Sequence, residues 1–553
     1  MIKSVLCIAI FLLPFAVSAF DVPRSAFDVQ LSTPHAPINI VGDSNFTPAN
    51  GVVSGSGTQS DPYIIEGWSI TLTQPERGIY IEGNTVYYIL RNIVIASLNK
   101  SAEGLRLYLS TNGIIENVTI VNPDIGVTIH SSRGLTIKNI FINNTNTGVQ
   151  IFNSQTIYLV NNTIKNSRIG YIIKDSVSIK MRNNTATNNT YNFGVSGSQP
   201  SNYWHDIDTS NIFNGKPVYY LVNETRTIEN ISAGYLGLVS FSGAIRNVSI
   251  KNALEGALLI NATQVNINGL KTETTLSGIQ SIESNFTIEN SSMILTNTGI
   301  SALNTSIIMK NSIINSSGSE IILSASRIIS YNNVLNLWNV AFLDEGSTLD
   351  VYNDLTVYVK NLREYPLKDI LVEINENSTL KYSGLTNSSG LYGPVKMYFG
   401  LLKKNGYFLS ITWVQVSYSG KTFFDNPRTV NMSISHTETF IENRTITVPS
   451  SPQNLNGIGY KNKVELTWFS PVSDGGSPLI GYNIYRGFST VNKSKIAEIG
   501  DEHSYVDTTV EPAKTYYYHV TAVNSAGESL PSNDVLIQTG TVPSAPVNIQ
   551  VFT

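Results

Sequence analysis

Apolar and polar residues alternate over short segments along most of the chain, as in residues 135–142, which is the pattern of half-buried β-strands. From residue 104 a glycine recurs every 22 residues, and each of the first four is followed three and eleven positions later by an apolar residue. After an interruption the register resumes, with a last unit of 21 residues. Short strands at this period, without a helical stripe, predict a parallel β-helix of roughly eleven rungs. The repeated glycines are Gly104, Gly126, Gly148, Gly170, Gly234, Gly256, Gly278 and Gly299.

Asparagine recurs at two further positions of the first four repeats, thirteen and eighteen residues after the glycine. We expect tight corners there, because asparagine adopts the left-handed conformation at small cost. Stacked rungs place equivalent residues about 4.8 Å apart, so the side-chain amides can bond to one another and should be buried between rungs. One structural ladder is predicted at Asn117, Asn139, Asn161 and Asn183, and the other at Asn122, Asn144, Asn166 and Asn188.

The pattern changes after the β-helix, which is predicted at 60–345. Residues 346–447 hold longer alternating strands, as in 355–360, and predict a small β-sandwich of immunoglobulin-like or transthyretin-like type. Residues 448–452, Val-Pro-Ser-Ser-Pro, predict a linker. The whole chain is therefore expected to be all-β, with a repetitive domain first and sandwich domains after it.

Residues 452–540 carry strand-length segments in a recognisable order. A tryptophan strand at 464–468 is followed by a central strand at 480–486 and a tyrosine-rich strand at 515–524. This order resembles a fibronectin type III domain. The final segment, 541–553, repeats the opening of that domain and then stops, which predicts the start of an incomplete second domain. A truncated chain explains it most simply. The alternatives are a disordered tail, or weak self-association in which this segment adds to a sheet edge of a neighbouring molecule.

Three further segments, together with the repeats, carry a resemblance to a known family. They are Ser-Asp-Pro-Tyr-Ile-Ile-Glu-Gly-Trp at 60–68, Asp-Thr-Ser-Asn at 208–211 and Asn-Gly-Lys-Pro-Val-Tyr-Tyr at 214–220. Over about residues 36–345 the chain resembles archaeal secreted β-helix proteins related to the NosD family. The resemblance implies a right-handed parallel β-helix of the pectin lyase-like fold and a cell-surface location. It implies much less about activity.

The N-terminal residues 1–19 predict a signal peptide, with Lys3 before an apolar run and Val-Ser-Ala before Phe20. Residues 20–59 would form an N-terminal segment and cap of the β-helix. The single cysteine, Cys7, lies inside the predicted signal, so no disulfide is expected in a secreted, mature chain. No later stretch approaches the apolar length of a transmembrane segment. Charged residues are only 14% and the net charge is −4, which argues against nucleic acid as a partner.

The interruption of the repeats, 194–233, holds the candidate binding chemistry. Insertions in solenoids often become loops that bind ligands, and this one combines aromatic, histidine and acidic residues. The same residue types also cap turns, so a purely structural role competes with sugar stacking. The candidate glycan-binding residues are Tyr203, Trp204, His205, Asp206 and Asp208.

The search for catalytic chemistry is mostly negative. The acids of the first regular rungs, Asp124 and Asp175, occupy different offsets, whereas a general acid and base must lie close together. We expect no catalytic residue, cofactor or metal site. The sequence favours a non-catalytic surface protein whose rigid stem serves carbohydrate binding, adhesion or envelope structure, with surface glycans or envelope proteins as partners. The alternative is a carbohydrate-active β-helix enzyme of the polysaccharide lyase or glycoside hydrolase type, which convergent charged side chains in a groove on one sheet face would favour.

Asn-x-Ser/Thr sequons are frequent and, in a secreted chain, predict a glycoprotein. Several coincide with the asparagine ladders, where composition alone creates the motif. The sequons outside the ladders are the better candidates for N-glycosylation, at Asn45, Asn99, Asn223, Asn377, Asn387, Asn431, Asn443 and Asn492.

Overall fold

The computed structural model describes residues 32–443 and 446–541, so the predicted signal peptide and the segment 542–553 lie outside the described residues. The described chain is all-β, and its helices are four short 3-10 turns, none long and apolar enough to cross a membrane. Two compact units are present, one extending to Asp350 and including Leu401–Tyr407, the other formed by the remainder. The 3-10 helices are η1 (Asp43–Asn45), η2 (Pro48–Asn50), η3 (Pro200–Tyr203) and η4 (Leu337–Asn339).

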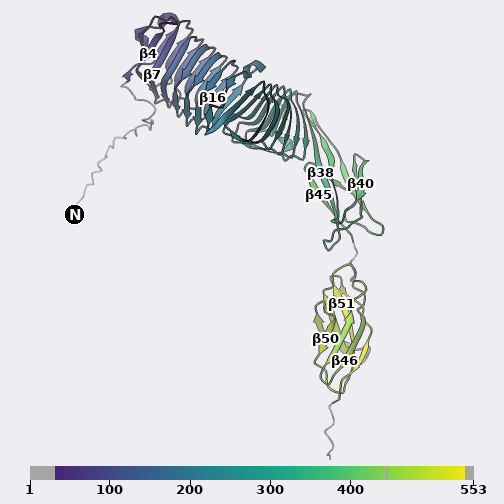
Figure 1. Cartoon of the computed structure of the whole chain (residues 1–553). Helices are drawn as coiled ribbons and strands as arrows, with labels where there is room; N and C mark the ends of the chain where they lie inside the picture. The colour runs from purple at the N-terminus through teal and green to yellow at the C-terminus, as the bar shows by residue number, and fades with distance from the viewer. Residues whose placement is uncertain (1–31, 444–445, 542–553) are drawn as a thin grey trace, which may run out of the picture. The chain divides into compact units, whose positions relative to one another are not determined.

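The first unit is a β-solenoid of about 13 turns (Figure 1). Its first wall is a seven-stranded parallel sheet in which each strand pairs with the strand one turn later, for example Ile129 with Ile151 and Ile151 with Ile173. The turns exceed the roughly eleven expected, because residues before 60 already contribute strands to the stack. This sheet consists of β2 (Ile38–Val41), β6 (Arg77–Glu82), β8 (Glu103–Tyr108), β10 (Ile125–His130), β13 (Thr147–Phe152), β16 (Ile169–Lys174) and β19 (Tyr191–Ser196).

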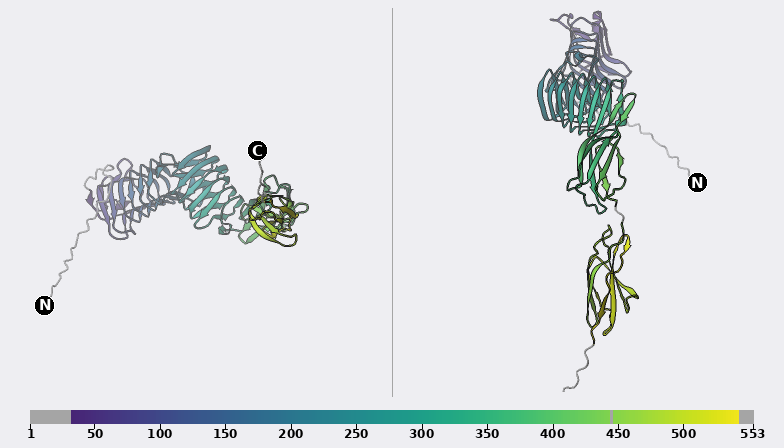
Figure 2. Two further views of the ribbon diagram at one scale, coloured as in Figure 1. Left: turned by 90° about the horizontal axis from the view of Figure 1, so that it is seen from below. Right: turned by 90° about the vertical axis from the view of Figure 1, so that its right-hand side faces the viewer.

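Further strands complete each turn, and Figure 2 shows the stack from two other directions. In the first half these are β1 (Thr33–Pro34), β3 (Val52–Ser54), β4 (Tyr63–Glu66), β5 (Trp68–Leu72), β7 (Tyr88–Ser97), β9 (Gly113–Val121), β11 (Arg133–Lys138), β12 (Phe141–Asn143), β14 (Gln155–Val160), β15 (Thr163–Lys165), β17 (Lys180–Arg182), β18 (Thr185–Thr187), β20 (Asp206–Ile207) and β21 (Ile212–Phe213).

The second half of the solenoid has two parallel sheets. One holds β22 (Lys216–Val222), β24 (Tyr235–Val239), β26 (Glu255–Ile260), β29 (Ser277–Ile282), β32 (Thr298–Leu303), β35 (Ile321–Ser324) and β37 (Val340–Phe342). The other holds β23 (Thr225–Ala233), β25 (Ser242–Lys251), β27 (Thr263–Asn268), β28 (Lys271–Glu273), β30 (Asn285–Glu289), β31 (Ser292–Thr296), β33 (Ser306–Lys310), β34 (Ile313–Ser316) and β36 (Arg327–Tyr331).

The expected insertion at 194–233 is in large part built into the solenoid, which differs from the prediction. β20 pairs with β17, β21 pairs with β18, and β22 pairs in parallel with β24. The reason is visible in β22, where Val218 and Tyr220 alternate inward like the apolar residues of a regular rung. The segment between β19 and β20, which contains η3, is the part that leaves the stack.

The repeated glycines mark places where no side chain fits. A Cβ built on Gly148 would lie 2.6 Å from the carbonyl oxygen of Gly170 and 2.6 Å from Cγ2 of Ile164. Gly104 and Gly126 meet the same two kinds of neighbour, the next glycine carbonyl and an inward isoleucine. The 22-residue glycine period therefore reflects close packing of a strand start against the next turn, not a left-handed backbone.

The asparagines of the two predicted ladders occupy the corners, and all eight have positive φ. Their amides bond from turn to turn: Nδ2 of Asn139 donates to Oδ1 of Asn117 at 3.4 Å, and Nδ2 of Asn144 donates to Oδ1 of Asn122 at 2.7 Å. The expectation that these amides are buried is wrong. Asn144 is exposed and Asn139 half-buried, because the left-handed corner turns the side chain outward.

A further, buried asparagine ladder was not predicted. It lies one residue after the outward ladder that contains Asn161 and Asn183. Asn184 is fully buried, its Oδ1 accepts from the backbone N–H and the side-chain amide of Asn162, and its Nδ2 donates to the carbonyl of Leu159 and to Oδ1 of Asn211. Ser110, Ser132, Ser154 and Ser176 form a similar buried row at another corner, in which the hydroxyls of Ser132, Ser154 and Ser176 each accept the backbone N–H of the serine one turn earlier. These inward polar groups satisfy corner N–H groups that the parallel ladder leaves without a carbonyl.

The second unit contains two successive β-sheet regions. Its first part has β38 paired in parallel with β45, and an antiparallel sheet in the order β40, β39, β43, β44. Its assignment as immunoglobulin-like or transthyretin-like stays a prediction. The strands are β38 (Thr348–Lys360), β39 (Leu371–Glu376), β40 (Thr379–Leu385), β41 (Leu391–Lys403), β42 (Gly406–Leu409), β43 (Thr412–Ser417), β44 (Arg428–Val430) and β45 (His436–Ile441).

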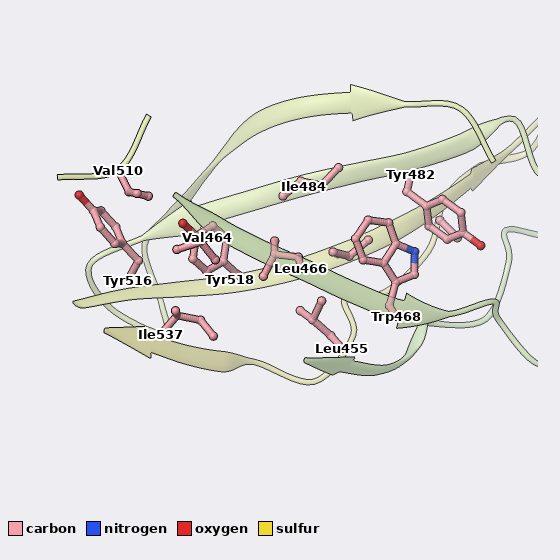
Figure 3. Packing of buried hydrophobic residues seen from close by; sticks show 12 residues of the cluster. Leu455, Val464, Leu466, Trp468, Tyr482, Ile484, Val510, Tyr516, Tyr518 and Ile537 are labelled. Atoms are coloured by element: carbon pink, nitrogen blue, oxygen red, sulfur yellow. The ribbon is translucent and has the colours of Figure 1, made fainter. Parts of the chain in front are cut away.

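The last part is the sandwich expected from the fibronectin type III resemblance. Sheet β46–β47–β50 faces a sheet of β49, β48, β51 and β52 with β53 beside β51, and Trp468 packs edge-on against Tyr482 between them (Figure 3). The strands are β46 (Gln453–Gly459), β47 (Val464–Phe469), β48 (Gly481–Gly487), β49 (Lys493–Ile499), β50 (Ser504–Asp507), β51 (Thr515–Asn524), β52 (Gly527–Glu528) and β53 (Val535–Gln538).

Replacing a stacked glycine should destabilise the solenoid. Gly148→Ala forces a methyl group against a backbone carbonyl, and we expect a loss of about 1–3 kcal/mol in the free energy of unfolding. Gly346→Ala is the matched control, because its added Cβ would meet only Oδ1 of Asp344 at 3.4 Å. Denaturant unfolding of both variants measures the difference, and equal stabilities would contradict the packing explanation.

The buried ladder at Asn184 and the outward ladder at Asn183 should contribute differently to the free energy of unfolding. Asn184→Ala leaves the buried N–H of Asn162 and the carbonyl of Leu159 without their partner, and we expect a loss of about 1–3 kcal/mol or more. Asn183→Gly removes the neighbouring outward amide while keeping a residue that tolerates positive φ, so we expect a loss below about 1 kcal/mol. A larger loss for Asn183→Gly in thermal unfolding would reverse the assignment.

Candidate functional site

The structure separates the five residues predicted to bind glycans. Tyr203, the last residue of η3, is only 1% exposed, and its hydroxyl accepts from the backbone N–H of Gly197 at 2.9 Å and donates to the carbonyl of Gly197 at 3.0 Å. Its ring therefore closes the base of its own loop and offers no face for a sugar. Trp204, the next residue, is 47% exposed.

His205 is also buried. Its Nδ1 accepts the backbone N–H of Ile179 at 3.4 Å, its ring lies 5.9 Å from that of Tyr220, and its Nε2 is buried without a hydrogen-bond partner. Burial lowers the pKa of His205 to about 4, so the ring is neutral near pH 7 with its proton on Nε2.

Asp206 and Asp208 lie at the rim of a hollow of about 400 Å³, which His205, Tyr220, Glu224 and Arg226 also line. Both carboxylates pair with Arg182, Asp208 through Nε at 3.0 Å, and Asp206 also approaches Nζ of Lys180 at 3.5 Å. The hydrogen bond from Arg182 holds the pKa of Asp206 below its ordinary value. Charged groups thus converge here, as an enzyme would require, but neither Asp206 nor the imidazole of His205 is held in the acidic form that a general acid needs.

Behind this hollow, Glu255 marks the seam between the two halves of the solenoid. Backbone bonds join β19 to the residues before β26, from Asn192 to Asn252 and from Leu254 to Phe193. At the next position the N–H of Val195 instead donates to Oε2 of Glu255 at 3.3 Å, and the hydroxyl of Tyr235 donates to the same oxygen at 2.8 Å. Burial raises the pKa of Glu255 to about 7.

A more regular constellation, which was not predicted, lies on the outward face of the seven-stranded sheet. Tyr108, His130 and Phe152 stand at paired positions of β8, β10 and β13. The rings of Tyr108 and His130 stack at 5.2 Å and 13°, and those of His130 and Phe152 meet edge-on at 6.4 Å. Glu82 precedes this aromatic row and Lys174 follows it. The available signal was an aromatic or imidazole ring four residues after each of three successive repeat glycines.

A polar hollow of about 490 Å³ runs beside the aromatic row. The residue that follows each member of the row lines it, namely Leu109, Ser131 and Asn153. Nδ2 of Asn153 lies 3.4 Å from Nε2 of His130, so the hollow and the row are in direct contact. Hydroxyl, amide and charged side chains complete the lining, among them Asn84, Thr85, Thr111, Arg133, Gln155 and Asp175.

The candidate N-glycosylation sites differ in exposure. Asn45 and Asn99 are half-buried, and the amide oxygen of Asn99 accepts the backbone N–H of Ser101 at 2.8 Å. Which sequons carry glycans stays a prediction. The remaining six are exposed: Asn223, Asn377, Asn387, Asn431, Asn443 and Asn492.

Comparison with known families supports both domain resemblances. Residues 36–220 match the family described as periplasmic copper-binding protein (NosD), and residues 450–538 match the fibronectin type III domain. The NosD-like β-helix and the fibronectin domain are thereby confirmed, whereas an archaeal origin and secretion stay predictions. The domains together fit an extracellular or cell-surface protein.

Individual relatives cover small parts of the chain. Exoglucanase B of Cellulomonas fimi is 35% identical over 98 residues, which are 18% of this chain and 8% of that protein. Titin of Drosophila melanogaster is 26% identical over 168 residues, 30% of this chain and 1% of titin. Among solved structures, an Fn3-like protein from Clostridium thermocellum is 27% identical with a TM-score of 0.15, covering 18% of this chain and all of that one. The chain thus spans less than a tenth of either curated relative.

The copper in that family's description has no evident binding place here. Within residues 32–443 and 446–541, no three His, Cys, Asp or Glu side chains come together in an arrangement that could hold a metal ion. His130 contacts Tyr108 and Asn153, and His205 lies beside Tyr220.

His205 and Glu255 should give the folding stability opposite pH dependences. Glu255 has a folded pKa of about 7 against 4.5, so it contributes stability that is lost as pH rises through that range. His205 has a folded pKa of about 4 against 6.5, so stability is lost as pH falls through that range. The buried tyrosines around them, Tyr203, Tyr220 and Tyr235, have raised pKa values and do not titrate in this window.

Single variants of Glu255 and His205 should reveal the pH-dependent contribution of each residue to the folding stability. Relative to the parent, Glu255→Gln should gain stability as pH rises from about 4.5 to 7, and His205→Asn should gain stability as pH falls from about 6.5 to 4, each by on the order of 2–3 kcal/mol. Denaturant unfolding at several pH values measures both differences, in which all other titrating groups cancel. Variant and parent curves that run parallel would contradict the assignment.

Proposed function

We propose that the protein is a non-catalytic extracellular or envelope protein whose solenoid binds an extended, uncharged polysaccharide. The observation that carries this proposal is the in-register aromatic row Tyr108, His130 and Phe152 beside the polar hollow. The rings offer apolar surface to the C–H groups of sugars, and adjacent hydroxyl and amide groups offer hydrogen bonds. A repeating scaffold and a repeating polymer can engage each other over several units at once.

The charges around the row favour an uncharged polymer. Glu82 and Lys174 flank it at its two ends, and Arg133 and Asp175 face the hollow beside it. Positive and negative groups are thus balanced, so no net field attracts a polyanion or a polycation. The low charge content of the whole chain, 14%, agrees with this.

The second candidate function is a carbohydrate-active enzyme at the hollow formed around Asp206, Asp208 and Glu224. The convergence of these acids with Arg182 and Arg226 favours it. The pairing of Asp206 and Asp208 with Arg182 counts against it, because those carboxylates are committed to ion pairs. Release of reducing ends from polysaccharides by the parent, lost in Asp208→Asn, would support this enzyme; no release by the parent would exclude it for the substrates tried.

Truncation of the aromatic row should weaken glycan binding. We expect Phe152→Ala and Tyr108→Ala each to reduce affinity for a neutral polysaccharide about five- to tenfold, as the loss of one stacked ring implies. Tyr158→Ala is the matched control, because Tyr158 is an exposed tyrosine on another wall, in β14. Affinity electrophoresis in gels that contain cellulose derivatives, mannan or xylan measures the change. A parent that binds none of them, or equal losses in all three variants, would contradict the proposal.

A further inference from the structure

A separate hollow of about 470 Å³ lies where the seven-stranded sheet begins. It is formed by β2, β6 and β8 and by the segments that precede them. β2 is the terminal strand of this sheet, so the row of outward positions ends here. Pro37, Arg77, Tyr80 and Glu103 are among the residues that line it.

Glu103 places an unused hydrogen-bond acceptor at this hollow. The residue is 8% exposed, and its Oε2 accepts from Nε of Arg77 at 3.3 Å and from Nη1 of Arg106 at 3.4 Å. Its Oε1 is buried and has no hydrogen-bond partner. A buried carboxylate oxygen without a donor is rare because it costs free energy, and a ligand hydroxyl group would satisfy it.

Arg77 and Tyr80 supply the complementary groups. The guanidinium of Arg77 lies 4.6 Å from the centre of the Tyr80 ring, and the hydroxyl of Tyr80 donates to Glu82 at 2.6 Å. The ring and the carboxylate of Glu103 therefore hold the guanidinium in place from two sides. A fixed guanidinium beside an unpartnered carboxylate oxygen can bind two neighbouring hydroxyl groups, one as acceptor and one as donor.

This hollow lies on the same outward face as the aromatic row, toward the opposite ends of the strands. Tyr80 pairs with Arg106 and Glu82 pairs with Tyr108, so the hollow and the first ring of the row lie on the same outward face, one turn apart. The chain segments that carry Pro37 and Pro75 line its outer end. Arg77 and Glu103 begin β6 and β8, whereas Tyr108 ends β8, so a polymer that crosses the sheet obliquely from the row would reach this hollow where the sheet stops.

We infer that the hollow around Glu103 and Arg77 is a subsite for the terminal residue of the glycan, so that the protein recognises the end of a neutral polysaccharide chain through a vicinal pair of hydroxyl groups. This inference rests on the proposed function. Glu76, Glu82 and Glu103 outnumber Arg77 and Arg106 around the site, which disfavours an acidic sugar there.

The test titrates the full chain with cello-, manno- and xylo-oligosaccharides of increasing length and with the corresponding polymers. Isothermal titration should show one protein per chain whatever the chain length. Glu103→Gln and Arg77→Ala should each lower affinity at least tenfold for short and long chains, whereas Phe152→Ala should affect mainly the longer ones. Glu116→Gln is the matched control, because Glu116 also pairs with a cation, Lys138 at 2.7 Å, but on another wall.

The outcomes separate the two proposals. In one outcome the number of bound protein molecules grows with chain length, and Glu103→Gln and Arg77→Ala bind with the affinity of the parent. This outcome would overturn the end subsite and leave the proposed function standing. Loss in Glu103→Gln and Arg77→Ala without any loss in Phe152→Ala would support the subsite and overturn the row. A parent that binds no chain of any length would overturn both. Arg77 is 45% exposed at its side chain, so its truncation tests the subsite even if Glu103→Gln fails to fold.

Discussion

Backbone hydrogen bonding between successive turns is the constraint on which the solenoid depends. Each parallel strand must place its N–H and C=O groups against those of the next turn, which fixes the rung spacing at about 4.8 Å and keeps equivalent residues in register. Any residue type that recurs at one offset then becomes a continuous row. Ile129, Ile151 and Ile173 make such a row inside, and Tyr108, His130 and Phe152 make one outside.

The corners are where this constraint is hardest to meet. At a corner the strand ends, so a backbone N–H loses its regular partner while it stays buried. Side chains replace the missing carbonyl there: the hydroxyls of Ser132, Ser154 and Ser176 accept these N–H groups on one corner, and the amides of Asn184 and Asn211 do so on another. The outward asparagines provide the left-handed backbone conformation that turns the chain at each corner.

These rules explain which features could be predicted from the sequence. The glycine period revealed the solenoid because steric exclusion at Gly148 tolerates no other residue, and the outer asparagines marked the corners because few residues accept positive φ. The inner ladder was missed because its position holds Val118 and Ile140 in earlier repeats, where apolar residues fill the same place. The burial of Tyr203 depends on its bonds to Gly197 within a loop that does not repeat, so no period could reveal it.

Backbone pairing between turns also explains why the break in the stack and the regular outward face carry different chemistry. Where turns repeat, backbone groups satisfy one another, and the outward positions are free to hold rings and polar groups for a ligand. Between β19 and β26 the regular bonding fails, and a carboxylate, Glu255, takes the place of a backbone carbonyl for Val195. A buried carboxylate in that role is sensitive to protonation, whereas the neutral rows are not. Recognition on the regular face is therefore built from groups held in register by backbone pairing, whereas the seam depends on a titratable carboxylate.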